Sequence, residues 1–100
     1  MMEQVSKKWL GLLGLARRAG KLLFVEEANM KAIRSRKAAL IILAEDAAQN
    51  TKKNYYNKAR FYNIPILEKG TKQILGQAIG SSNTAAIVCL DRGFSKQLQR

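Results

Sequence analysis

The sequence predicts an α/β domain, a three-layer α/β/α sandwich with a mostly parallel four-stranded sheet. Segments with helical spacing of apolar residues alternate with short apolar runs along the chain. Two of these runs, 40–44 and 86–90, are apolar without interruption, as is typical of strands buried on both faces. Strands that alternate with helices favour parallel pairing through right-handed crossovers. With 100 residues, of which 47% are hydrophobic, we expect one domain over 1–100.

The first third of the chain predicts two helices joined by a short extended segment. The first helix follows from apolar residues that recur at helical spacing, namely Val5, Trp9, Leu12, Leu13 and Ala16. We expect Gly20 to end this helix and residues 21–24 to be extended. The second helix is expected from Glu26 to about Ser35, because acids open its first turn and basic residues crowd its last, which complements the helix dipole.

In the middle of the chain, the buried strand at 40–44 is followed by a third helix and a strand that contains Pro65. Asn50 or Thr51 is expected to cap the helix, which runs through Tyr62. Pro65 lacks the backbone N–H that a central strand must donate. Pro65 is therefore expected at the start of a strand or in an edge strand, and not within a central strand.

The last third predicts a short helix, the second buried strand and a final helix. Thr71 is expected to cap the short helix, which runs to Ile79 and is closed by Gly80. The polar loop 81–84 then leads into the second buried strand, and Asp91 begins the last helix.

Charge is the strongest indication of a binding partner. The chain has 18 Lys and Arg against 7 Asp and Glu, a net charge of +11, and a pI of about 10.2. A domain this basic favours a polyanion, above all nucleic acid, over a protein that is only basic and soluble. The basic residues gather in three groups: Arg17, Arg18 and Lys21; Lys31, Arg34, Arg36 and Lys37; and Lys52, Lys53, Lys58 and Arg60. Whether Tyr55, Tyr56 and Tyr62 form an exposed stacking row for bases stays open.

Composition excludes several kinds of site. The chain has no His and one Cys, Cys89, so we expect neither an intramolecular disulfide nor the usual kind of zinc site. A reduced, cytoplasmic setting fits this cysteine usage best. The apolar run 9–16 is shorter than the roughly 20 residues that span a bilayer and ends in a basic pair, so we expect no membrane span and no signal peptide. We expect no metal and no cofactor.

The candidates for catalysis are weak. Gly14 and Gly20 resemble a phosphate-binding loop, but five residues separate them, and Leu22 stands where Ser or Thr must hold magnesium. Glu45 and Asp46 follow a buried strand, where paired carboxylates could support a small hydrolase. The favoured interpretation is that Asp46 accepts hydrogen bonds from backbone N–H groups of the following turn. We therefore expect no enzyme.

Three motifs then occur in a familiar order: LIILAED at 40–46, IP at 64–65, and LGQAIG at 75–80 with an apolar strand just behind. They resemble the kink-turn-binding ribosomal protein superfamily, whose archetype is the archaeal large-subunit protein of the L-seven-Ae type. The opening WLGLLGLARRAGK at 9–21 resembles the bacterial YlxQ-like branch. The resemblance runs from about residue 7 to residue 98.

The resemblance implies an α/β/α sandwich that binds structured RNA bends. In the family, a helix N-terminus carries Gly-x-Asn-Glu-x-x-Lys, whose polar pair reads sheared G·A base pairs and whose Lys meets phosphate. A second loop, after the LGxAxG motif, covers a flipped-out nucleotide. In this chain the first element falls on Val25, Glu26, Glu27, Ala28 and Lys31, and the second on Ser81, Ser82, Asn83, Thr84 and Ala85.

The chain departs from this pattern at three positions. Val25 stands at the Gly position, where a positive φ becomes harder to adopt. Glu27 stands at the Asn position and Ala28 at the Glu position, so only Lys31 matches outright. A carboxylate at Glu27 can accept from guanine N–H edges, although it brings negative charge near phosphates. The competing interpretation is that Glu26 and Glu27 are ordinary first-turn acids.

The sequence therefore predicts an RNA-binding, ribosome- or translation-associated protein whose partner is ribosomal RNA or another kink-turn-like RNA. The expected surface combines the start of the second helix with the loop Ser81, Ser82, Asn83 and Thr84. Phosphates are expected to be held by Lys31, Arg34 and the cluster of Arg17, Arg18 and Lys21. The alternative is a protein-interaction module of the same fold with only non-specific RNA affinity.

Overall fold

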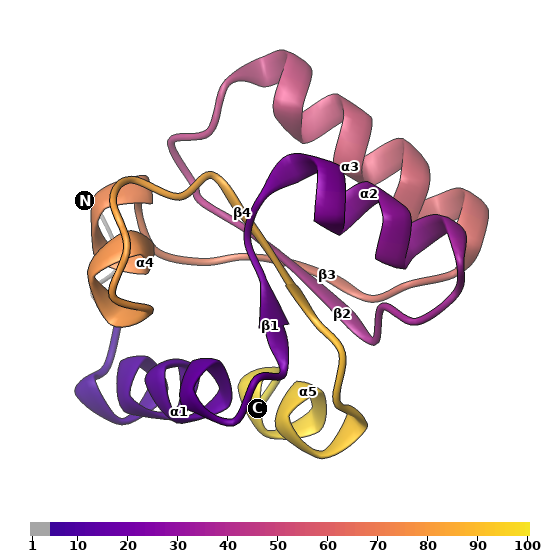
Figure 1. Cartoon of the computed structure of the whole chain (residues 1–100). Helices are drawn as coiled ribbons and strands as arrows, with labels where there is room; N and C mark the ends of the chain where they lie inside the picture. Colours follow the sequence, from indigo (N-terminus) through magenta and orange to yellow (C-terminus); the bar gives the residue numbers. More distant parts are fainter. Residues whose placement is uncertain (1–4) are drawn as a thin grey trace.

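The computed structural model describes residues 5–100, which form a four-stranded sheet and five helices (Figure 1). The elements are, in order, α1 (Lys7–Arg18), β1 (Leu22–Leu23), α2 (Glu26–Arg34), β2 (Leu40–Leu43), α3 (Gln49–Tyr62), β3 (Ile66–Glu68), α4 (Lys72–Ala78), β4 (Ala86–Cys89) and α5 (Arg92–Leu98). The strand order across the sheet is β1-β4-β2-β3. Strands and helices thus alternate as the sequence predicts.

The sheet is mixed, and the prediction of a mostly parallel sheet is wrong. Only β2 and β3 pair in parallel, with Ile41 opposite Ile66. Strand β4 lies between β1 and β2 and is antiparallel to both, with Cys89 opposite Leu22 on one side and Leu40 on the other. Strand β3 is at the edge and begins directly after Pro65, so Pro65 is outside the central strands, as predicted.

The direction of β4 follows from the position of α4. Glu68, at the end of β3, and Ala86, at the start of β4, both lie opposite Leu43 at the end of β2. A parallel crossover must carry the chain back along the whole sheet before the next strand begins. Helix α4 has seven residues and lies beyond the end of the sheet instead of across a face (Figure 1). The chain therefore re-enters the sheet at the same end of the strands at which it left after β3.

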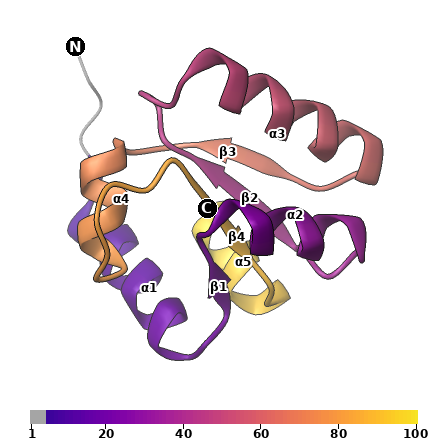
Figure 2. The same cartoon turned by 45° about the horizontal axis from the view of Figure 1, so that its top comes forward.

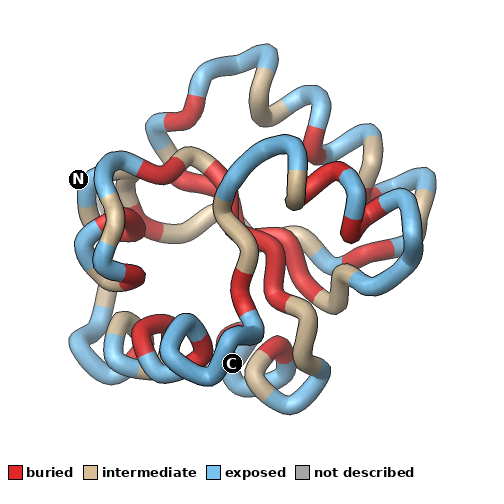
Figure 3. Tube along the Cα trace, viewed as in Figure 1, coloured by how far each residue is buried: buried red, intermediate tan, exposed pale blue. Residues whose placement is uncertain are grey.

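Helices cover both faces of the sheet. Leu40 and Ile42 of β2 pack in a core with α1, α4 and α5, whereas Ile41 and Leu43 pack in a second core with α2 and α3. All residues of β2 and β4 are buried, which confirms the prediction from their uninterrupted apolar runs (Figure 3). In Figure 1 the sheet separates α2 and α3, above it, from α1 and α5, below it.

The helix ends agree with the sequence at four of the five places where a cap or a stop is predicted. Gly80, with φ +72°, follows the end of α4. Gly20, with φ +74°, follows the end of α1. The Thr71 hydroxyl accepts from the Ile74 N–H at 3.1 Å, and the Asp91 carboxylate accepts from the Phe94 N–H at 2.8 Å. These caps define where α4 and α5 begin.

The predicted cap of α3 at Asn50 or Thr51 is wrong. Helix α3 begins at Gln49 with Ala48 as its cap, and no side chain among residues 5–100 caps it. The helical ladder starts at Ala48 because its carbonyl accepts from the Lys52 N–H at 3.0 Å. Ala47, just before it, is buried in the core and holds the chain there.

Candidate nucleic-acid interface

The backbone N–H groups in the first turn of α2 have no side-chain acceptor among the described residues, and this turn lies at one end of the sheet. Val25 is the N-cap of this helix, in an extended conformation with φ −97° and ψ 132°, so the positive φ that a Gly permits is not adopted. N–H groups in the first turn of a helix attract anionic or carbonyl oxygens. The Val25 side chain is 59% exposed beside them.

One face of α2 carries the charged residues of the predicted surface. Glu27, Lys31 and Arg34 are spaced at i, i+4 and i+7, so they lie along the same side of the helix. All three are exposed, as is Glu26, whereas Ala28 is half-buried. Lys31 and Arg34 therefore extend a positive stripe away from the open N-terminus, and Glu27 lies at the beginning of that stripe.

The loop after α4 is held tightly on that helix. A Cβ on Gly76 would lie 1.9 Å from the Ser82 carbonyl oxygen, so only glycine allows the loop to pass this close. The Ser81 N–H donates to the Gly76 carbonyl at 2.8 Å, and the Thr84 N–H donates to the Lys72 carbonyl at 3.0 Å. The loop is therefore preorganised by backbone contacts.

Within this loop the side chains have different environments. Ser82 and Asn83 are exposed, and Ser81 is half-buried. Thr84 is only 4% exposed, and its hydroxyl donates to the Ser82 carbonyl at 2.9 Å. Thr84 thus shapes the loop from inside, while Ser82 and Asn83 are the polar side chains that it presents to solvent.

The fold brings the start of α2 together with Ala85, the residue that follows this loop. Glu26 and Ala85 line one small pocket of about 110 Å³. Ala85 is held there because its carbonyl accepts from the Ala44 N–H at 2.8 Å at the end of β2. In Figure 2 the segment leading into β4 runs close to the start of α2.

A buried polar residue beneath the start of α2 was missed by the sequence reasoning. Asn29 is 1% exposed, and its amide donates to the Tyr55 hydroxyl at 3.1 Å and the Ala86 carbonyl at 3.3 Å. It ties α2 to α3 and to the first residue of β4. The signal was present, because Asn29 lies four residues before the buried Ile33 and so shares its inward face. Burial raises the pKa of the Tyr55 phenol.

The cluster of Arg17, Arg18 and Lys21 is only partly brought to this edge. The Arg17 guanidinium lies 5.0 Å from the ring centroid of Phe24, which lines the small pocket with Glu26. Arg18 lies beside Gly14, where α1 packs on α4. Lys21 is at the opposite end of β1, where its carbonyl accepts from the Leu90 N–H. Of the three, Arg17 is therefore the one that approaches the start of α2.

The two carboxylates after β2 have structural partners. The Asp46 carboxylate accepts from the Lys72 N–H at 2.8 Å, so it helps to cap α4. The prediction of a backbone N–H partner is right, but the prediction that it belongs to the following turn is wrong. The Glu45 carbonyl accepts from the Lys52 ammonium at 2.7 Å. Among the described residues no group of His, Cys, Asp or Glu is arranged to hold a metal ion.

The tyrosines do not form a stacking row. Tyr55 is buried, and the ring of Tyr62 is covered by the Arg36 guanidinium at 5.3 Å. The Tyr56 hydroxyl donates to the Glu68 carboxylate at 2.6 Å, which raises the pKa of Tyr56 to about 12. The same bond, together with the Lys52 ammonium 3.0 Å away, lowers the pKa of Glu68.

Comparison with known proteins assigns the family. Residues 7–99 match the family described as Ribosomal protein L7Ae/L30e/S12e/Gadd45. The chain belongs to this family. Two relatives match nearly its whole length, which confirms the resemblance found in the motifs. RNA-binding protein YlxQ of Bacillus subtilis (strain 168) is 36% identical over 91 residues, which are 91% of each chain. RNA-binding protein YlxQ of Enterococcus faecium is 37% identical over 97 residues, which are 97% of this chain and 93% of the relative.

Solved structures share the fold of this chain. A protein with unknown function from Bacillus halodurans C is 44% identical and has a TM-score of 0.90, with 94% of this chain and 95% of that chain covered. The Giardia lamblia 15.5kD RNA binding protein has a TM-score of 0.77 at 18% identity, over 97% of this chain and 89% of that chain, which shows a shared fold. No helix within residues 5–100 is long and apolar enough to cross a membrane.

Proposed function

We propose that this protein binds RNA and recognises a bent or internal-looped RNA of the kink-turn kind, with ribosomal RNA as the first candidate and a role in translation in the cytoplasm. Two relatives that match over most of the chain are named RNA-binding proteins. A net charge of +11 favours a polyanionic partner independently of those names.

The observation that carries the proposal is the meeting of two segments that are far apart in the sequence. Glu26 at the start of α2 and Ala85, the residue after the loop 81–84, border one small pocket, and the loop is held by backbone hydrogen bonds. Such preorganisation lowers the entropic cost of binding a ligand of defined shape. A surface that served only non-specific attraction to phosphates would need no such arrangement.

The chemistry of this edge suits RNA with unpaired or sheared bases. Double-helical RNA hides its base edges in a deep, narrow major groove, whereas internal loops expose them. The open N–H groups after Val25 would donate to phosphate or base oxygens, and the Glu27 carboxylate would accept from guanine N–H groups. Lys31 and Arg34 would contact the backbone of the same RNA along α2, with Arg17 beside Phe24 at the other flank.

The test compares a kink-turn duplex with a plain duplex of equal length, at several salt concentrations. We expect the kink-turn to bind at least tenfold more tightly, because base edges are available only there. Equal affinities would refute specific recognition and leave only electrostatic attraction. Lys31→Gln with Arg34→Gln should reduce the slope of log K against log salt by roughly 1.5, since each phosphate contact contributes about 0.7–0.9.

A matched control is Lys8→Gln, an exposed lysine on α1, on the other face of the sheet from α2. It removes one positive charge without touching the proposed surface, so the preference for the kink-turn should not change. If the double variant retains the RNA affinity of the unmodified protein, the α2 surface is wrong. A protein-interaction module with non-specific RNA affinity would then describe the chain better.

A further inference from the structure

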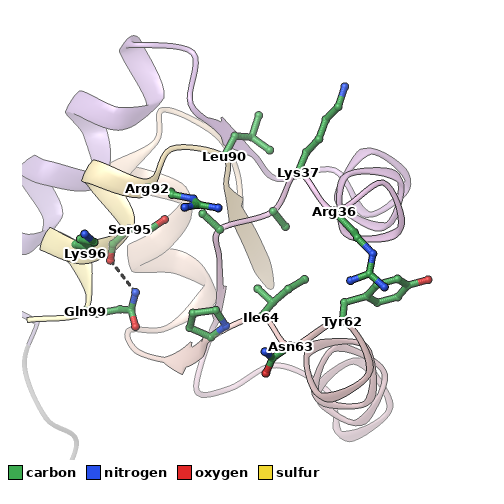
Figure 4. Close-up of a pocket in the computed structure, with 13 residues that line it drawn as sticks. Arg36, Lys37, Tyr62, Asn63, Ile64, Leu90, Arg92, Ser95, Lys96 and Gln99 are labelled. Atoms are coloured by element: carbon green, nitrogen blue, oxygen red, sulfur yellow. Dashed lines mark hydrogen bonds between the residues drawn. The ribbon is translucent and has the colours of Figure 1, made fainter.

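A second, larger pocket lies at the opposite end of the sheet from the start of α2. It has a volume of about 360 Å³, near the lower limit of the roughly 300–1,000 Å³ that small-molecule sites have. Arg36 and Ala39 line it just before β2 begins, and Leu90 and Arg92 line it just after β4 ends. The end of α3 closes the remaining side (Figure 4). The pocket is thus separate from the edge where α2 starts.

The pocket is lined by positive charge and by no acid. Its cationic residues are Arg36, Lys37, Arg92 and Lys96. Within residues 5–100 the one ion pair joins Lys52 to Glu68, so none of these cations is neutralised by a carboxylate there. Asp91, next to Arg92 in the chain, uses its carboxylate to cap α5. An anion that entered the pocket would meet attraction without a competing carboxylate on its walls.

A buried hydroxyl without a partner lies in this pocket. Ser95 is 3% exposed, and its Oγ has no hydrogen-bond partner among the described residues. Buried polar groups normally have a partner, so an orphaned one in a pocket wall indicates a ligand. In Figure 4 the guanidinium of Arg92 lies on the side to which the Ser95 hydroxyl points. A hydroxyl beside a guanidinium is a donor pair that suits phosphate oxygens.

Two aromatic rings lie at the end of α3: one lines the pocket, and the other stands beside it, outside the lining. Tyr62 lines the pocket, and the Arg36 guanidinium lies over its ring (Figure 4). Phe61 is 75% exposed, and its ring centroid is 4.8 Å from that of Tyr62 in an edge-to-face arrangement. Arg36 has φ +61°, a conformation that costs a residue with a side chain about 1 kcal/mol or more. An exposed ring of this kind is a stacking surface for a base.

We propose that this pocket is a second binding site, for a nucleotide unit whose phosphate is held by Arg92 and Ser95 and whose base stacks on Phe61. The positive walls attract the phosphate. Stacking on Phe61 favours a nucleotide over inorganic phosphate and over an acidic peptide, because neither of these carries a base. The ligand is either a nucleotide within single-stranded RNA or a free nucleotide. The site does not depend on the proposed kink-turn surface, because the two lie at opposite ends of the sheet.

The test is an NMR titration of the whole protein with three probes: inorganic phosphate, adenosine monophosphate and a single-stranded adenosine tetranucleotide. We expect the last two to shift the backbone amide signals of Arg92, Ser95 and Tyr62. Arg92→Gln should weaken both about tenfold, because a charge-assisted hydrogen bond is lost. Phe61→Ala should weaken both by about tenfold while leaving the weak binding of inorganic phosphate unchanged, because only stacking is removed.

Lys8→Gln is the matched control, since it removes one exposed positive charge from α1, does not line this pocket and lies outside the proposed kink-turn surface, so it should leave these titrations unchanged. Both test residues are exposed, so equal urea midpoints for all variants will show that the fold is intact. Tighter binding of the tetranucleotide identifies RNA as the source, and equal binding identifies a free nucleotide. Shifts confined to the start of α2, wild-type affinity in Arg92→Gln, or equal binding of a polyglutamate peptide would each overturn the proposal.

Discussion

Gly76 is where α4 and the loop of the proposed RNA surface come closest. A Cβ at this position would lie 1.9 Å from the Ser82 carbonyl oxygen and 2.6 Å from its carbonyl carbon. Gly76→Ala must therefore push the Ser82 carbonyl outward until the separation from the Cβ reaches at least 3.0 Å, a movement of about 1 Å. The obstacle is backbone, so no side-chain rotation relieves it.

The size of the effect follows from two opposing contributions. Overpacking of this kind costs about 1–3 kcal/mol. Replacing a helical Gly by Ala contributes about 1 kcal/mol in the opposite direction, because Ala loses less backbone entropy. Gly11→Ala provides the matched reference, since Gly11 is likewise the fifth residue of its helix, and a Cβ there meets nothing within 4 Å. The two variants share the propensity gain, so their difference isolates the clash.

The assay is urea unfolding of both variants beside the unmodified protein. We expect Gly11→Ala to be more stable by about 0.5–1 kcal/mol and Gly76→Ala to be less stable than Gly11→Ala by about 1–3 kcal/mol. Amide shifts in Gly76→Ala should concentrate at 81–84, and affinity for the kink-turn duplex should fall. Equal stability of the two variants would refute the close approach of the loop to α4.

Two further substitutions test contacts that hold the layers together. Trp9→Phe removes the buried hydrogen bond, 2.8 Å long, from the indole N–H to the Leu98 carbonyl. It should lower the free energy of unfolding, measured by urea titration, by about 1–3 kcal/mol. No loss would mean that α1 and α5 are joined by apolar contact alone. Tyr56→Phe should raise the pKa of Glu68 toward its ordinary value of 4.5, as followed by NMR of the carboxyl carbon, because the phenol is the main cause of the lowered value. In the unmodified protein, the lowered pKa of Glu68 means that its carboxylate stabilises the fold above pH 4.5, and this contribution is lost as the pH falls through the lowered pKa. The unmodified protein should therefore lose more stability on acidification than the variant does. An unchanged Glu68 titration would contradict the hydrogen bond.

The parts of the candidate site that lie within one short segment of sequence could be predicted. The start of α2 and the loop 81–84 both follow from the sequence, because helix starts and polar loops are local features. Asn29 and Phe61 were not identified. Asn29 is distinguished by its burial beneath α2, and Phe61 by its exposure near the end of α3. The position of Lys21 away from the α2 edge was also hidden, because neighbours in sequence can face opposite ends of a strand.

The sequence by itself determined which segments form helices and strands and which strands are buried on both faces. Those properties depend on residue spacing, caps such as Thr71 and Asp91, and the exclusion of Pro65 from a central strand. Only the tertiary structure decided the direction of β4, the meeting of α2 with the loop after α4, and the basic pocket at the other end. A strand buried on both faces has the same apolar pattern whichever way it runs. Its direction is set by the end of the sheet at which the preceding helix lies. Helix α4 lies at the end where β3 stops, so β4 starts from that same end.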